Sequence, residues 1–227
     1  MSESFSESDL FLSNLSKLTS AEGLELPEHM KAELKFFRLI SAKGLGLPKH
    51  LDGTLNLTSL SSAEGLKLPD YIKDHLNLSG LTSANGLKLP YHIGGDLYLN
   101  KLTSAEGLQF PQHIGGDLDL PYLTSAEGWE LPKYIGGSLS LNSLTSPKGL
   151  KLPCHIGGRL YLSDLTTAKG LELPNYVGGN VYLPCLTTVK GLELPDYIGG
   201  DIYFSEQISK KGLKLPGHFG GQVKYCE

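Results

Sequence analysis

Residues 94–114 read GGDLYLNKLTSAEGLQFPQHI, and residues 115–135 repeat the same order as GGDLDLPYLTSAEGWELPKYI. The string G-L-x-L-P, with small variations, begins at Gly23 and recurs every 21 residues, without insertion or deletion, up to Gly212. Counted from that first glycine, position 5 of the unit holds ten of the 13 prolines, and positions 1, 9 and 10 hold 25 of the 28 glycines. A fixed period of about 20–50 residues is typical of repeat architectures, in which each unit buries its apolar face against its neighbours.

The apolar positions of the unit predict its strands. Positions 12 and 14 are apolar in nearly every unit and flank a variable position 13, as Leu97 and Leu99 flank Tyr98. This alternation is typical of a short strand with one buried side. Positions 2 and 4 repeat the alternation, so we expect a second extended segment there, ended by the proline at position 5, which cannot donate a ladder hydrogen bond. The isoleucines of position 8, leucines of position 17 and alanines of position 20 complete the expected core.

The expected fold is therefore a β-rich solenoid of about ten 21-residue coils over residues 23–227, with few or no helices. Residues 1–22 are expected to form an acidic, serine-rich tail and cap. Residues 28–39 can also be read at helical spacing, but a strand in register with the other coils, with Leu34 and Phe36 inward, is the preferred interpretation. The glycine pair of positions 9 and 10 is expected to supply either positive φ or a close backbone approach between coils.

The unit D-L-Y-L-x-x-L-T-S-A-E-G-L-K-L-P resembles bacterial leucine-rich repeats, in which L-x-L is followed by a polar turn and then L-T-x-L-P. The resemblance extends from about residue 23 to residue 227 and implies a binding scaffold, since many bacterial members look like secreted effectors or surface proteins. It departs at the family's usual asparagine ladder, three residues after L-x-L, where this chain has leucine; a plain β-solenoid is the alternative architecture. These leucines are Leu102, Leu123, Leu144, Leu165 and Leu186.

Composition excludes several other classes of protein. The formal net charge of −4 and pI near 6.0 argue against a general nucleic-acid binder. No stretch approaches the ~18 consecutive apolar residues of a membrane-spanning helix, and the opening MSESFSESDL lacks the features of a secretory signal. Three cysteines are too few for a disulfide framework. We therefore expect a cytoplasmic protein, or one delivered without a classical signal peptide.

Position 7 of the unit carries the residues that most resemble a metal site. A ladder of histidines on adjacent coils could bind zinc, but tyrosine replaces histidine in four coils and is not a usual zinc ligand. Stacked, half-buried rings are the favoured interpretation, and no metal or cofactor is expected. No unique cluster of nucleophile, base and stabilising group stands out from the repeated columns, so we do not expect an enzyme. The six histidines are His29, His50, His92, His113, His155 and His218.

The outward, variable positions 11 and 13 are the expected binding face. Tyr161, Tyr182 and Tyr203 occupy position 13 in three consecutive coils and should form one aromatic strip. Tyrosine and arginine are enriched at interface hot spots, although tyrosine is also a good strand former and aromatic cross-strand pairs stabilise sheets. The leading hypothesis is a protein partner of unknown identity. Its expected contact residues are Tyr98, Arg159, Tyr161, Asn180, Tyr182, Asp201 and Tyr203.

Two alternative functions have other locations. Position 21 carries lysine in the C-terminal half of the chain, and this column could bind an anionic partner. The chain stops at Val223-Lys224-Tyr225 in the middle of a coil, so pairing of this edge could give a homodimer. The four lysines are Lys148, Lys169, Lys190 and Lys211.

Overall fold

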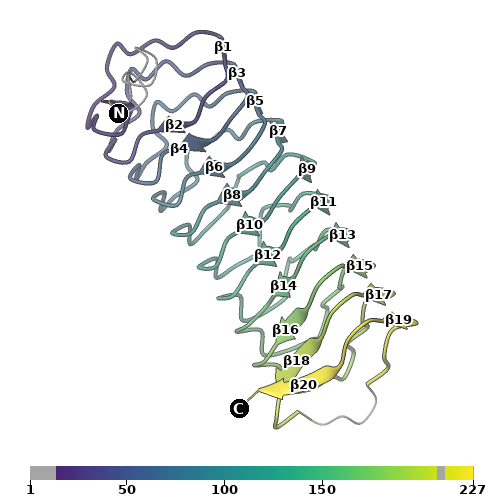
Figure 1. Cartoon of the computed structure of the whole chain (residues 1–227). Helices are drawn as coiled ribbons and strands as arrows, with labels where there is room; N and C mark the ends of the chain where they lie inside the picture. Colours follow the sequence, from purple (N-terminus) through teal and green to yellow (C-terminus); the bar gives the residue numbers. More distant parts are fainter. Residues whose placement is uncertain (1–13, 209–212, 227) are drawn as a thin grey trace, which may run out of the picture.

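The computed structural model describes residues 14–208 and 213–226. They wind into a parallel β-solenoid whose coils stack in one direction from the N-terminal to the C-terminal end (Figure 1). Each coil gives one short strand to each of two parallel sheets, which have ten strands apiece in the described part. Strand partners lie 21 residues apart, as Leu118 and Leu139 do, so the sequence period is the length of one coil. The predicted solenoid is confirmed, with essentially no helix.

One sheet, which we call the odd sheet, contains β1 (His29–Met30), β3 (His50–Leu51), β5 (Tyr71–Ile72), β7 (His92–Ile93), β9 (His113–Ile114), β11 (Tyr134–Ile135), β13 (His155–Ile156), β15 (Tyr176–Val177), β17 (Tyr197–Ile198) and β19 (His218–Phe219). The other, the even sheet, contains β2 (Leu34–Lys35), β4 (Leu55–Asn56), β6 (Leu76–Asn77), β8 (Leu97–Tyr98), β10 (Leu118–Asp119), β12 (Leu139–Ser140), β14 (Leu160–Tyr161), β16 (Val181–Leu183), β18 (Ile202–Ser205) and β20 (Val223–Cys226).

The even sheet lies where the sequence predicts it, but the second sheet does not. We expected it at positions 2–4 of the unit, and the structure forms it at positions 7 and 8. Positions 2–4 make only isolated bridges within the described part, such as the one between Glu172 and Glu193. The proline that follows has no N–H with which to extend such a bridge into a ladder, whereas the residues after it pair freely.

The core positions are those that the sequence predicts. One coil shows this for positions 8, 12, 14 and 17. Its side chains there are completely buried, namely Ile93, Leu97, Leu99 and Leu102. The same core continues toward the N-terminus as far as Leu15. Each buried leucine or isoleucine contributes about 1.5–3 kcal/mol through removal of apolar surface from water. The stacked leucines therefore hold the coils together.

The first coil settles the choice between strand and helix. Phe36 is completely buried next to the strand β2, while its neighbour Phe37 is 43% exposed. Such an inside–outside change between adjacent residues is the geometry of a strand. The in-register strand interpretation of residues 28–39 is confirmed.

Glycine has two separate roles in the coil. Positive φ is found at position 1, for example at Gly107 with φ of 75°, a conformation that other L-residues avoid. The glycine pair of positions 9 and 10 instead allows close packing: a Cβ added at Gly136 would lie only 2.1 Å from the carbonyl oxygen of Gly115 in the preceding coil. Of the two roles expected for the pair, the structure shows the close approach.

Candidate functional site

The backbone hydrogen bonds of each coil change direction at position 11. Gly136 donates its N–H to the carbonyl of Ile114 in the preceding coil, at 2.9 Å, whereas Leu139 donates to Arg159 in the following coil, at 2.8 Å. Between them, the N–H of Ser138 still points toward the preceding coil. A side chain accepts it: Oδ1 of Asp117 lies 2.6 Å away. A polar side chain at position 11 thus serves the backbone of the next coil.

This arrangement recurs along the even sheet from His75 to Gln222, and we call it the position-11 ladder. Its contacts measure 2.6–3.1 Å from the backbone nitrogen of one coil to the side-chain acceptor of the coil before. Arg159 interrupts it, because a guanidinium group has no acceptor. No acceptor for the backbone N–H of Asn180 is found among the described residues. The accepting side chains belong to His75, Asp96, Asp117, Ser138, Asn180 and Asp201.

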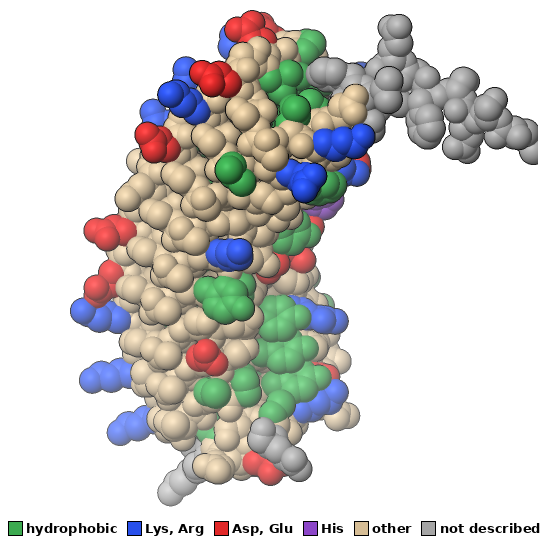
Figure 2. Space-filling model, turned by 90° about the vertical axis from the view of Figure 1, so that its left-hand side faces the viewer, with side chains coloured by type: hydrophobic (Ala, Val, Ile, Leu, Met, Phe, Trp, Pro, Cys, Tyr) green, Lys and Arg blue, Asp and Glu red, His purple; other side chains and the backbone are tan. Residues whose placement is uncertain are grey.

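The tyrosine strip (Tyr161, Tyr182 and Tyr203) lies beside this interruption. Its rings stack nearly parallel, with centroids 4.7 Å apart for the first pair and 4.6 Å for the second. Because the faces cover one another, ring edges and hydroxyl groups remain for a ligand to meet. Figure 2 shows hydrophobic side chains, a class that includes tyrosine, gathered in a column on the C-terminal half of the molecule. The strip that the sequence predicts therefore forms.

Tyr98 is not part of the strip. Asp119 and Ser140 occupy position 13 in the two coils between Tyr98 and Tyr161. The Tyr98 hydroxyl donates a 2.6 Å hydrogen bond to Asp96, and this contact, with burial and nearby carboxylates, raises the pKa of Tyr98. The predicted set of contact residues thus divides, with Tyr98 standing apart.

Each hydroxyl of the strip contacts the position-11 side chain of its own coil. Nη1 of Arg159 lies 3.3 Å from the Tyr161 hydroxyl. Nδ2 of Asn180 lies 2.9 Å from that of Tyr182. The strip, Arg159, Asn180 and Asp201 therefore form one connected group, as the sequence predicts.

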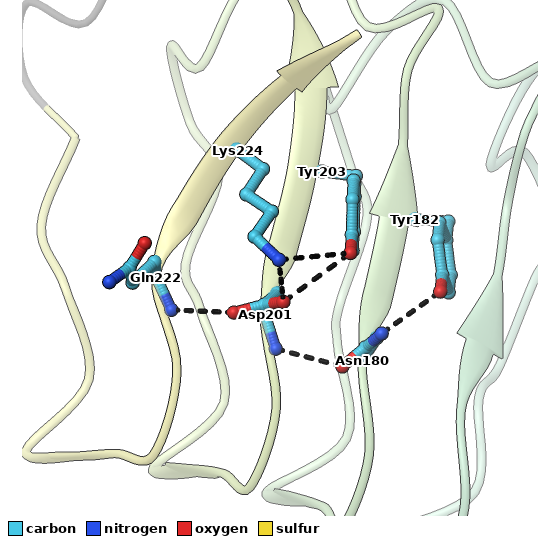
Figure 3. A network of polar contacts seen from close by, with 6 residues as sticks. All are labelled: Asn180, Tyr182, Asp201, Tyr203, Gln222 and Lys224. Carbon is cyan, nitrogen blue, oxygen red and sulfur yellow. Dashed lines mark hydrogen bonds and ion pairs between the residues drawn. The ribbon is translucent and has the colours of Figure 1, made fainter.

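The C-terminal end of this group is internally neutralised (Figure 3). Tyr203 donates its hydroxyl to Asp201 at 3.3 Å, and Lys224 forms an ion pair of 2.6 Å with the same carboxylate. The hydrogen bond from Lys224, with that from the Gln222 backbone, lowers the pKa of Asp201. Lys224 and Gln222 were not among the predicted site residues, although both continue the two columns by one coil.

Position 7 of the odd sheet carries a different aromatic column. Its rings stack as expected, for example His50 on Tyr71 at 4.2 Å and Tyr134 on His155 at 4.5 Å between centroids. This confirms the stacking interpretation. In the part of the chain that the structure describes, no three histidine, cysteine, aspartate or glutamate side chains are grouped so as to hold a metal ion. Nor do the described residues include a helix long and apolar enough to cross a membrane.

The lysine column of position 21 is less uniform than its sequence suggests. Lys148 forms an exposed ion pair of 2.7 Å with Glu127 of the preceding coil. Lys169 and Lys190 are exposed and have no ion pair among residues 14–208 and 213–226. Lys211 lies outside the described residues. Figure 2 shows lysine and arginine side chains at both edges of this view, with acidic side chains among those at the left.

A groove that the sequence pattern does not predict runs along positions 2–6. It has a volume of about 730 Å³, and half-buried leucines of position 4, such as Leu152 and Leu173, lie in it beside Pro153 and Pro174. We expected these leucines to point inward with those of position 2. The lack of a regular strand at this point leaves them partly exposed.

Comparison with known proteins gives no match. No protein-family model fits the chain, and no curated protein or solved structure is significantly similar to it. The relation to leucine-rich repeats and the bacterial origin therefore stay expectations of the sequence.

Proposed function

We propose that this solenoid is a non-enzymatic scaffold that binds a protein partner through the outward face of the even sheet, centred on the tyrosine strip. The observation that carries the proposal is the interruption of the position-11 ladder at Arg159. A residue without an acceptor stands there, beside the strip, in a column whose contacts otherwise run without a gap from His75 to Gln222 in the described residues. Departures from a local structural rule tend to occur at functional sites.

The distribution of aromatic residues supports a binding role for the strip. Position 7 carries histidine or tyrosine in every coil, as expected of a column that stabilises its sheet. Position 13 carries tyrosine in only four coils, three of them consecutive. Stacking alone would favour tyrosine throughout the even sheet. The local cluster, next to an exposed arginine, has the composition of an interface hot spot.

Support for a non-catalytic role comes from the partners of the polar groups. Asn180 and Asp201 each accept a backbone N–H of the next coil, and the hydroxyls of Tyr182 and Tyr203 contact these same side chains. These contacts build the sheet face. Because the polar groups beside the strip are used in these contacts, the strip is suited to contact the surface of a partner rather than to activate a nucleophile.

The test is partner capture by the full chain and by a variant in which Tyr161, Tyr182 and Tyr203 are replaced by Ser. Proteins retained by the wild type and lost by this variant, identified by quantitative mass spectrometry, would be strip-dependent partners. Circular dichroism melting establishes that both chains are folded.

A matched control removes three tyrosines from the other sheet. Tyr134, Tyr176 and Tyr197 belong to the position-7 column, where Tyr176 and Tyr197 stack at 4.6 Å between centroids. Their replacement by Ser should leave capture unchanged. A folded strip variant that retains every partner of the wild type would refute the location of the site.

A further inference from the structure

We propose that Arg159, Tyr161 and Tyr182 form a carboxylate-binding site, which takes an acidic side chain of the protein partner. The inference deepens the proposed function, because it gives the chemistry of the group that meets the strip. It starts from the direction of the hydrogen bonds between the strip and the position-11 side chains.

Tyr161 and Tyr182 are both hydrogen-bond acceptors in the structure. A guanidinium group can only donate, so the 3.3 Å contact from Arg159 uses a lone pair of the Tyr161 oxygen. The Asn180 amide is oriented by its own partner, because its Oδ1 accepts the backbone N–H of Asp201 at 2.9 Å. Its Nδ2 must therefore donate to Tyr182. No described residue accepts the hydroxyl protons of Tyr161 and Tyr182, so both can donate to a ligand.

Tyr203 has the opposite polarity. A carboxylate can only accept, so the Tyr203 hydroxyl donates to Asp201 (Figure 3). Lys224 also points toward this carboxylate and hydroxyl. The hydroxyls of Tyr161 and Tyr182 thus accept hydrogen bonds within the protein and keep their protons, whereas Tyr203 uses its proton on Asp201.

The donors match the size of a carboxylate. The rings of Tyr161 and Tyr182 are parallel and 4.7 Å apart, which puts their two hydroxyls side by side. Arg159 is exposed and uses one N–H on Tyr161, and its other donors have no partner among residues 14–208 and 213–226. A carboxylate has two oxygens and about four lone pairs, enough to accept from all three residues at once. Arginine–carboxylate hydrogen bonds are also among the strong ones, because both groups are charged.

The charge favours a carboxylate over a phosphate. Arg159 supplies one positive charge, and the nearest lysine of the face, Lys224, is already paired with Asp201. One guanidinium balances one carboxylate, whereas a phosphate near −2 would be half neutralised. Flat ligands such as nucleobases are disfavoured, because the faces between the stacked rings are covered.

The experiment titrates the isotope-labelled full chain with three capped tripeptides, Gly-Glu-Gly, Gly-Gln-Gly and Gly-phosphoSer-Gly. NMR shifts of the Arg159 side-chain N–H and of the tyrosine rings report binding. We expect saturable binding of the Glu peptide, at least about tenfold tighter than that of the Gln peptide. Tyr161→Phe and Tyr182→Phe should each weaken it about fivefold. Arg159→Gln should weaken it more than either.

Tyr98→Phe is the matched control, because it removes a position-13 hydroxyl that lies outside the strip and already donates to Asp96 of its own coil, and binding should stay within about twofold. An equal loss in this control, equal affinity for the Gln peptide, or no saturable binding would overturn the proposal. Tighter binding of the phosphoserine peptide would also overturn it, in favour of a phosphate site. If the Glu peptide fails to bind but partner capture still needs the strip, the inference fails alone. If the peptide binds and no partner needs the strip, the proposed function fails and the carboxylate site remains.

Discussion

Replacing Arg159 by Asn should make the protein more stable, because it completes the position-11 ladder. In the next coil, Asn180 accepts the N–H of Asp201 through Oδ1 at 2.9 Å and donates to Tyr182 through Nδ2 at 2.9 Å. An asparagine at position 159 can do the same for the N–H of Asn180 and the hydroxyl of Tyr161. The change copies an arrangement that the adjacent coil already contains.

The expected gain is about 1 kcal/mol in the free energy of unfolding. One added hydrogen bond contributes about 0.5–1.5 kcal/mol. The contact that is lost, 3.3 Å between exposed Arg159 and Tyr161, is replaced by a donor from the new amide. For a domain of this length the gain corresponds to a rise in melting temperature of about 2–4 °C.

Urea denaturation of the wild type, Arg159→Asn and Arg159→Ala measures the effect. The alanine variant removes the guanidinium without supplying an acceptor, so it should not show the gain. Hydrogen exchange of the Asn180 amide reports the new bond directly and should slow in the asparagine variant alone. Equal stability of the two variants, with unchanged exchange at Asn180, would refute the reasoning about the ladder.

Three further changes test other parts of the structure by urea denaturation. Burial, then the charges of Asp117 and Asp96, raise the pKa of Asp119; the folded state therefore holds this proton more tightly, and stability falls as pH rises through the raised pKa. Asp119→Asn should thus raise the free energy of unfolding at pH 7, and this gain should disappear at a pH below the ordinary pKa range of a carboxyl group. An equal gain at pH 7 and at the acidic pH would contradict this. Gly107→Ala should cost about 1–2 kcal/mol, because φ is 75° there; a neutral result would contradict the backbone argument. Leu120→Ala, at a fully buried site, should cost about 2–5 kcal/mol, and a loss as large for Leu152→Ala in the groove would be inconsistent with the structure.

The period of the sequence predicts the coil and its core well, because both depend on burial. The variable residue between Leu97 and Leu99 indicates that both leucines point inward. This pattern repeats every 21 residues without insertion or deletion. The odd sheet is harder to predict, because each coil gives it a single inward residue, such as Ile93. One apolar residue cannot show an alternation. Positions 2 and 4 do show one, which is why the second sheet was expected there.

The candidate site could be predicted in its members but not in its connections. Tyr161, Tyr182 and Tyr203 are placed on one face by the coil length alone. The ladder depends on where the backbone hydrogen bonds reverse direction, and no periodicity of side chains reports that. The sequence does contain one signal of the ladder. The residue at position 11 carries a hydrogen-bond acceptor in every coil except that of Arg159.

Arg159 also allows stability and binding to be separated. In a solenoid, each coil contacts only its two neighbours, so a local departure is felt locally and is not masked by the rest of the fold. If Arg159→Asn is more stable and no longer binds the Glu peptide, the arginine carries out a function at the expense of the ladder, which is the usual relation between stability and activity at a site. If the variant is more stable and binds equally well, the interruption has no role in binding, and the argument that places the partner at this point of the even sheet fails with it.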